Sequence, residues 1–257
     1  MESGSQVKTA RVLAQLSRPQ LAAMAGVASS TIGRIESGEM DPSLGMLGRI
    51  LCAAGFRLPD AEQVSDPAAV AAARGILEDD RALLSYPGAS AWLQRWRAAG
   101  FLTGEGKARD PAVLAFRAGM AARLVARPGI RSYARIGSWL EIARRIDAAG
   151  PGWAATGGAA ANRLLGSADA YWPVFYVDDP SSTAAAAGFV PSSGGGKPVL
   201  SLIPFDGVAD VGVEIGADGL RWAAPIQVVI DSFGGTGRMP EQAEAIAERW
   251  KEQAGAR

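Results

Sequence analysis

Residues 16–38 read LSRPQLAAMAGVASSTIGRIESG and predict two short amphipathic helices joined by a tight turn. Ser17 is a suitable N-cap for the first helix, and Gln20 stands three positions later, where it can complete a capping box. Gly26 accepts the left-handed conformation in which helices often end. Because two helices joined in this way can place the second in the major groove of B-DNA, the stretch indicates a DNA-binding unit.

The flanking segments extend this stretch into a compact helical domain of about five elements. The helices expected here are 6–15, 18–25, 29–37 and 44–54. A polar connector at 59–66 ends the domain, and helices at 67–85 and 88–100 follow it. Trp92 and Trp96 lie at helical spacing, which is more typical of a core than of a cofactor site.

The sequence changes after Gly150-Pro151-Gly152. Apolar runs at 171–177 and 198–204 are typical of buried strands, and residues 192–196 between them form a Ser/Gly-rich loop. Shorter strands are expected within 208–222, with a turn at 217–219. The helices expected in this part of the chain are 111–126, 132–149, 224–233 and 240–253.

The predicted fold class is therefore multidomain, with an all-α helix-turn-helix domain at residues 1–60. A helical segment at 61–110 connects it to the rest and serves either DNA binding or dimerisation. A mixed α+β domain occupies residues 111–257.

The composition excludes several kinds of site. With no histidine and a single cysteine, the chain has no Ser-His or Cys-His triad, no histidine-bound zinc and no disulfide framework. We therefore expect no metal and no cofactor. Cys52 stands among apolar residues of an expected helix and is interpreted as a buried, unreactive thiol. The polar N-terminus and the lack of a long apolar run predict a cytoplasmic, nucleoid-associated protein without a membrane span.

The net charge is zero but unevenly distributed. Residues 86–149 carry 11 basic and 4 acidic side chains, which suits a polyanion or an acidic protein, although arginine-rich composition alone would explain it equally well. Residues 1–60 carry 6 basic and 5 acidic side chains. With so few cations for phosphates, this domain is expected to need dimerisation or a second basic surface within 86–149.

The pattern of residues 16–38 resembles the lambda-repressor/Cro-like, or XRE, family of helix-turn-helix regulators. The matching positions are Leu16-Ser17, Leu21-Ala22, Ala25-Gly26-Val27, Ser30-Thr31-Ile32, Ile35-Glu36 and Gly38, followed by Pro42-Ser43 and a leucine-rich helix. The resemblance covers residues 7–58 and implies a DNA-binding domain. It also implies an internal ion pair between Arg11 and Glu36, which is structural.

The helix expected at 29–37 presents its polar residues near its N-terminus, where base-reading side chains are expected. Arg34 can bind guanine O6 and N7 together, and Ser29 and Ser30 are short, permissive donors. Thr31 and Arg18 are better placed for phosphates. The last candidate for DNA contact is Gln20, which could touch the DNA backbone or brace Ser29.

A second resemblance covers about residues 111–253. Its segments are Trp153–Ala161, Tyr176–Asp179, Gly219–Asp231, Gly237-Arg238 and Glu241–Ala243. They resemble the AbiEi-type antitoxins of type IV toxin–antitoxin systems. This implies an autorepressor encoded beside a nucleotidyltransferase-like toxin, which it neutralises without necessarily touching it. Such antitoxins usually begin with a winged helix, whereas this chain begins with an XRE-type domain, so the mode of operator binding stays open.

Two motif residues of that region, Gln227 and Asp231, are more simply interpreted as stabilising local structure. An enzymatic alternative rests on Thr156-Gly157-Gly158 and Asp178-Asp179, which are similar to the Gly-Gly turn and Asp-x-Asp pair of nucleotidyltransferases. Adjacent carboxylates on a strand point to opposite faces, and Pro180 occupies the place of the second acid. Residues 194–197 lack the spacing of a P-loop. We therefore expect a protein that is not an enzyme.

The sequence as a whole predicts a dimeric, sequence-specific repressor that binds double-stranded operator DNA. We expect it to act as an autoregulating antitoxin, with a nucleotidyltransferase-like toxin as a further partner and no membrane contact. The alternative is a phage- or prophage-type repressor whose C-terminal domain dimerises or senses a ligand.

Overall fold

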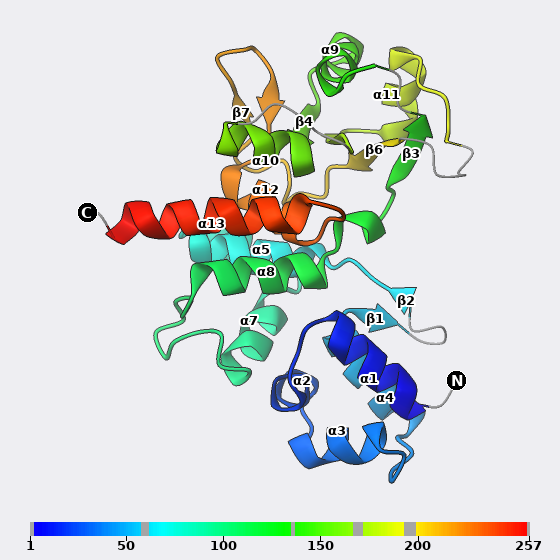
Figure 1. The fold of residues 1–257 in the computed structure, drawn as a ribbon, viewed down its shortest axis with the longest axis vertical. Coiled ribbons are helices and arrows are strands. Elements are labelled where there is room, and N and C mark those ends of the chain that lie inside the picture. Colours follow the sequence, from blue (N-terminus) through cyan, green and yellow to red (C-terminus); the bar gives the residue numbers. More distant parts are fainter. Residues whose placement is uncertain (1–2, 58–61, 135–136, 167–171, 193–198, 256–257) are drawn as a thin grey trace. The chain divides into compact units, whose positions relative to one another are not determined.

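The computed structural model describes residues 3–57, 62–134, 137–166, 172–192 and 199–255 (Figure 1). The chain forms two compact units, Met1–Ala122 and Arg123–Arg257. Within the described residues, the first unit is helical apart from short hairpins, and the second is built on a mixed sheet. The predicted fold class is confirmed: a helical N-terminal region and further helices precede a sheet with helices.

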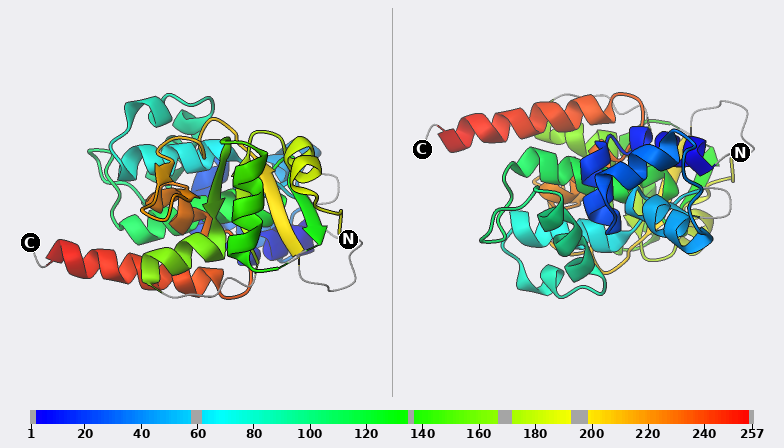
Figure 2. Two further views of the ribbon diagram at one scale, coloured as in Figure 1. Left: turned by 90° about the horizontal axis from the view of Figure 1, so that it is seen from above. Right: turned by 90° about the horizontal axis from the view of Figure 1, so that it is seen from below.

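Four helices form the described part of the N-terminal domain, shown in blue in Figure 2 (right). They are α1 (Ser3–Leu13), α2 (Arg18–Ala25), α3 (Ser29–Glu36) and α4 (Leu44–Ala53). Their shared core consists of fully buried aliphatic side chains, among them Val7, Leu21, Ile32, Ile35 and Ile50. The predicted ends of α2 are confirmed, because Ser17 and Gln20 form a capping box and Gly26 is left-handed, with φ of 67°.

A carboxylate shared by two arginines fixes α3 against α1 and α2. The side chain of Glu36 is 1% exposed and accepts hydrogen bonds from Arg11 Nε at 2.6 Å and Arg18 Nε at 2.8 Å. Arg11 Nη1 also donates to the carbonyl oxygen of Leu16 at 3.1 Å. Burial raises the pKa of Glu36, but the hydrogen bonds and charges of the two arginines outweigh this and hold the pKa below its ordinary value of 4.5. The cluster therefore adds Arg18 to the pair of Arg11 and Glu36.

Two details of the N-terminal domain differ from the sequence-based expectation. The domain is not wholly helical, because a short hairpin of β1 (Phe56–Arg57) and β2 (Glu62–Gln63) follows α4. The predicted domain boundary at residue 60 falls within 58–61, which lie outside the described residues. The prediction of a buried Cys52 is wrong: the thiol is exposed, because the inward face of α4 is taken by Leu47, Ile50 and Leu51.

The middle of the chain folds into four helices and a hairpin. The helices are α5 (Pro67–Leu77), α6 (Arg81–Leu84), α7 (Ala89–Ala98) and α8 (Pro111–Ala121). The hairpin is closed by a bridge between Leu102 and Ala108. The single helix expected at 67–85 is broken, because Asp79 is left-handed, with φ of 54°, and Asp80 caps a new helix. Because α6, α7 and α8 pack on α5, the expected connector is a folded element.

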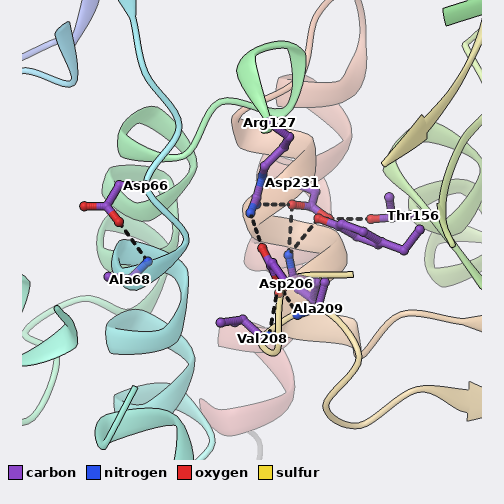
Figure 3. A network of polar contacts seen from close by, with 10 residues as sticks. Asp66, Ala68, Arg127, Thr156, Asp206, Val208, Ala209 and Asp231 are labelled. Atoms are coloured by element: carbon purple, nitrogen blue, oxygen red, sulfur yellow. Dashed lines mark hydrogen bonds and ion pairs between the residues drawn. The ribbon is translucent and has the colours of Figure 1, made fainter. Parts of the chain in front are cut away.

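The prediction that Trp92 and Trp96 are core residues is confirmed, since both side chains are buried, with ring centroids 5.5 Å apart. Trp92 Nε1 donates to Asp66 Oδ2 at 2.7 Å. The other oxygen of Asp66 caps α5 at the amide of Ala68 (Figure 3). One carboxylate thus holds the start of α5 to the middle of α7.

Helix α8 joins the middle segment to the N-terminal domain. Arg117 Nη1 donates to the carbonyl oxygens of Ala14 and Gln15 at 3.0 and 2.6 Å, just after the end of α1. Burial lowers the pKa of Arg117. Contacts thus group α8 with the first unit, whereas the boundary predicted between residues 110 and 111 assigns it to the C-terminal domain.

The second unit contains a six-stranded mixed sheet in the order β3-β6-β5-β4-β8-β7. The strands are β3 (Arg131–Ala134), β4 (Trp153–Thr156), β5 (Val174–Val177), β6 (Val199–Pro204), β7 (Glu214–Ile215) and β8 (Arg221–Trp222). Strand β6 runs parallel to β5, and β8 runs parallel to β4, while the other pairs are antiparallel. Every residue of β4 and β5 is buried, so both faces of the sheet are covered.

Two groups of helices cover this sheet. Helices α9 (Trp139–Ala149) and α11 (Pro180–Ala187) pack on each other, as do α10 (Gly157–Leu165), α12 (Pro225–Phe233) and α13 (Met239–Gly255) (Figure 1). A 3-10 turn, η1 (Leu124–Ala126), begins the unit. The prediction of a helix at 132–149 is wrong for its first part, where β3 pairs with β6. Helix α9 begins only after Ser138, which is its N-cap. Strand β4 was not expected, because the strand is only four residues long and its sequence, WAAT, has little preference for a strand.

A buried polar network lies between the sheet and α12. Asp231 accepts hydrogen bonds from Arg127 Nη2 at 2.8 Å, Thr156 Oγ1 at 2.7 Å, Tyr176 Oη at 2.9 Å and Gln227 Nε2 at 2.9 Å (Figure 3). Burial raises the pKa of the Tyr176 phenol, which keeps its proton available for this bond. The network thus ties η1, β4 and β5 to α12.

Asp206 completes the network on the other side of Arg127. Its Oδ2 lies 3.3 Å from Arg127 Nη1, and its Oδ1 accepts from the amides of Val208 and Ala209 (Figure 3). The guanidinium of Arg127 is 1% exposed and is held by two carboxylates. A buried charge of this kind is tolerated only while its partners remain in place.

We expect Glu36→Gln to lower the free energy of unfolding by about 3 kcal/mol at pH 7, because it leaves two arginines without their shared counter-charge. The pKa of Glu36 is lower in the folded state, so its contribution is complete above about pH 4.5 and is lost as pH falls through the folded-state value. Urea unfolding of the wild type and Glu36→Gln should therefore show a difference in unfolding free energy that becomes smaller as the pH is lowered from neutral to acid. Exposed Glu39→Gln serves as the control, with an effect within about 0.5 kcal/mol throughout. A difference in unfolding free energy that does not change with pH would contradict this account of the cluster.

We expect Asp231→Ala to destabilise the second unit by about 3–5 kcal/mol, because Arg127 loses its closest carboxylate inside the protein. Differential scanning calorimetry should show a clear drop in the melting temperature. Asp210→Ala removes an exposed carboxylate from the same unit and should change stability by no more than about 0.5 kcal/mol. Equal melting temperatures for Asp231→Ala and the wild type would show that the network is not a source of stability.

Candidate nucleic-acid interface

Helix α3 has one buried and one exposed face. Ile32 and Ile35 are fully buried, whereas Ser29, Ser30 and Arg34 are exposed. This follows from helical periodicity, since positions 29, 30 and 34 lie on the side opposite positions 32 and 35. The structure therefore brings three of the predicted base-reading residues together on one exposed surface. Their contact with bases remains a prediction.

The backbone around Arg34 is held firmly while its side chain reaches outward. The carbonyl oxygen of Arg34 accepts from the amide of Met40 at 3.0 Å and from Ser37 Oγ at 3.2 Å. The guanidinium carries donors in a planar fork that matches guanine O6 and N7. A fixed backbone with an exposed planar donor is the arrangement that direct base readout needs.

The first turn of α3 is another polar feature of this surface. Its N-cap is Ala28, which forms no side-chain capping bond. Thr31 is half-buried within this turn. In α2, by contrast, the Ser17 hydroxyl accepts from the amide of Gln20 at 3.3 Å, so this amide at the start of the helix already has an internal partner. The start of α3 is therefore the better place for a phosphate oxygen.

Arg18 and Gln20 have internal partners in addition to their predicted contacts with DNA. Arg18 binds Glu36 through Nε, and 52% of its side chain remains exposed. Gln20 Oε1 accepts from the amide and the hydroxyl of Ser17, both at 2.9 Å. No local pattern signals the contact of Arg18 with Glu36, because the two residues are 18 positions apart.

Part of the positive charge of the basic segment 86–149 is engaged inside the protein. Its residues belong to both compact units, and some of its arginines have internal roles. Arg127 is buried in the network around Asp231, Arg117 binds backbone carbonyls, and Arg145 Nη2 donates to the carbonyl oxygen of Gly188 at 3.2 Å. The surplus of positive charge is therefore not by itself a binding site.

The residues of the enzymatic alternative have structural partners. Asp179 is the N-cap of α11 and accepts from the amide of Ser182 at 2.6 Å, a bond that lowers the pKa of its carboxyl. Gly157 and Gly158 are buried, and a Cβ at Gly157 would lie 3.0 Å from Met239 Cε. Asp178 and Asp179 line a pocket of about 240 Å³.

Within the described part of the chain, no group of three or more Cys, Asp or Glu side chains is arranged to hold a metal ion. The predicted loop at 192–196 and the segment 194–197 fall largely on 193–198, outside the described residues. Every helix that the structure describes is too short or too polar to cross a membrane.

Gln227 and Asp231, the motif residues of the predicted C-terminal resemblance, are both fully buried. They contact each other, and Gln227 Nε2 also lies 3.2 Å from Tyr176 Oη. Both side chains therefore belong to the interior of the second unit, where most of their contacts are tertiary rather than local as the sequence suggested.

Comparison with known proteins identifies one part of the chain. A helix-turn-helix family model matches residues 7–60, which include most of α1 and all of α2 to α4. No curated protein and no solved structure matches the chain. The resemblance of residues 111–253 to AbiEi-type antitoxins is not confirmed. Residues 7–60 are an XRE-type helix-turn-helix domain, of the kind that binds DNA sequence-specifically in transcription regulation.

Proposed function

We propose that the protein is a transcriptional repressor that recognises its operator through the exposed face of α3. The observation that carries this proposal is the joint exposure of Ser29, Ser30 and Arg34 on a helix whose opposite face is fully buried. Helix α3 is the second helix of the motif, which is the one that enters the major groove in this class of domain. The residues that contact DNA are therefore those three, with Thr31 and Arg18 on phosphates and Gln20 beside them.

The charge of this domain favours binding as a dimer. Residues 1–60 carry 6 basic and 5 acidic side chains, and Arg11 is already held by Glu36. A single domain with so few available cations neutralises few phosphates, so its affinity at physiological salt is low. Two copies bound to a two-fold operator double the number of contacts.

We expect Arg34→Ala to remove the preference for the operator while leaving the fold intact. Loss of a bidentate guanine contact lowers discrimination by about 1–3 kcal/mol, and an exposed residue contributes no more than about 0.5 kcal/mol to stability. The measurement is a titration of full-length protein with operator and scrambled duplexes, after selection of the operator from genomic fragments.

Arg49→Ala is the matched control, since it removes the same charge from an exposed position on α4. It should keep the operator preference and the melting temperature of the wild type. The proposal fails if wild-type protein binds every genomic fragment no better than a scrambled duplex over a range of salt concentrations. Unfolding of Arg34→Ala would instead identify Arg34 as a structural residue.

We further propose that the repressor is the autoregulating antitoxin of a type IV toxin–antitoxin operon and has no catalytic role of its own. The support for this role is the sequence pattern of residues 111–253, and the capping role of Asp179 favours a non-catalytic second unit. The alternative, a phage- or prophage-type repressor, differs only in the task of the second unit.

The antitoxin role predicts that a neighbouring reading frame encodes a nucleotidyltransferase-like protein. Expression of that neighbour alone should arrest growth, and co-expression of this chain from an unrelated promoter should restore it. Arg34→Ala should restore growth as well as the wild type, because neutralisation would depend on the second unit. Growth arrest that persists with both proteins present would favour the prophage-type repressor.

A further inference from the structure

We propose that residues 81–109 form a second surface for duplex DNA, in which α7 enters a major groove and the following hairpin contacts the adjacent phosphates. This inference rests on the proposed function, because it assigns a further contact on the duplex that α3 reads. The residues that carry it are Gln94 and Arg97 on α7, and Lys107 and Arg109 on the hairpin.

The first support is the local geometry. Helix α6 ends at Leu84, the turn 85–88 follows, and α7 begins at Ala89. The turn ends in Gly88, whose φ of 88° reverses the chain direction at no steric cost. The pair α6–α7, like the pair α2–α3, is joined by a short turn that contains a left-handed glycine, although α6 is only four residues long.

The second support is the division of α7 into two faces. Trp92 and Trp96 are buried, and Asp66 holds Trp92 in place. The exposed residues of the helix lie on the other face and are Ser90, Ala91, Gln94, Arg97 and Ala98. Small residues on this face let the helix approach a duplex closely.

The chemistry of this face matches base readout. Gln94 can bind adenine N6 and N7 together, and Arg97 can bind guanine O6 and N7. Arg95 differs, since its guanidinium lies over the Trp92 ring at 4.8 Å from the centroid. Arg95 thus packs against the buried side of α7, whereas Arg97 is exposed.

The third support is the hairpin beside this face. Its ends are joined by bonds from the amide of Thr103 to the carbonyl of Lys107 at 2.8 Å and from the amide of Arg109 to the carbonyl of Phe101 at 3.0 Å. A Cβ at Gly106 would lie 3.4 Å from Arg97 Nη2, so the hairpin and the exposed face of α7 are neighbours.

The charge of the hairpin favours phosphate contact. Lys107 is 80% exposed, and its only close carboxylate among the described residues is the equally exposed Glu105 at 3.8 Å. An ion pair that is so exposed contributes little and exchanges readily for a phosphate. Arg109 is exposed on the same hairpin.

Both surfaces belong to one compact unit. Helix α7 packs against α2, and Arg117 of α8 binds the backbone just after α1. Because the N-terminal domain has few cations to offer phosphates, a second contact surface fixed to it supplies the charge that the domain lacks. Such a unit would read a longer operator than α3 alone.

The test is selection of a randomised duplex library by the full-length protein, followed by titration with the selected duplex. Wild type should select two blocks of preferred bases. Arg97→Ala and Gln94→Ala should each lose the second block and about tenfold or more in affinity for it, while Arg34→Ala loses the first. Lys107→Ala should lower the slope of affinity against salt by about one phosphate contact without changing the selected bases.

Arg144→Ala is the matched control, as it removes an exposed arginine from a helix of the second unit, and it should select both blocks. Circular dichroism shows whether each variant is folded, and sedimentation shows whether its oligomeric state has changed. The inference is overturned if Arg97→Ala and Gln94→Ala select the wild-type sequence with wild-type affinity. It is also overturned if they lose affinity only by becoming monomers. If the wild type selects a single block of preferred bases that depends on Arg34, this inference is wrong but the proposed function stands. If the wild type selects no preferred bases at all, the proposed function is wrong as well.

Discussion

The position of α3 depends on one buried carboxylate. Glu36 lies at the C-terminal end of α3, and its two arginine partners come from the end of α1 and the start of α2. Aliphatic packing brings these helices together without direction, whereas three charge-assisted hydrogen bonds at 2.6–3.2 Å fix their angle. Since Ser29 and Arg34 are carried on the same rigid helix, the cluster also orients the surface that faces DNA. An 18-position separation between Arg18 and Glu36 shows that this constraint is tertiary.

The elements that the sequence predicted well are those with local signals. The capping box of Ser17 and the left-handed Gly26 mark the ends of α2 in sequence and in structure, because both act within four residues. The exposed face of α3 was likewise predictable from its 3.6-residue period, since the two isoleucines mark the inner side. The candidate interface could therefore be located from the sequence alone, although Arg18 could not be assigned its second partner.

The elements that were missed depend on distant partners. Strand β3 has no apolar alternation of its own and exists because β6, some 70 residues later, supplies its hydrogen bonds. Strand β4 is short and alanine-rich, and its burial results from covering helices on both faces. Asp231 is equally non-local: three side chains distant in sequence converge on it, beside Gln227 one turn earlier in α12, and the sequence shows only a polar residue within an apolar helix. Cys52 was misplaced because its apolar neighbours obscured its outward position on α4.

The contrast between α3 and α7 bears on how much DNA this chain can read. Helix α3 offers two serines and one arginine, so its discrimination comes mainly from a single bidentate group. Helix α7 offers a glutamine and an arginine one turn apart, beside a hairpin with an exposed lysine. Phosphate contacts set affinity and base contacts set specificity, and the N-terminal domain is poor in the former because 5 acidic side chains nearly balance its 6 basic ones and Arg11 is held by Glu36. The cluster that orients α3 therefore reduces the charge available for binding, and a second surface in the same compact unit is the most direct way to restore it.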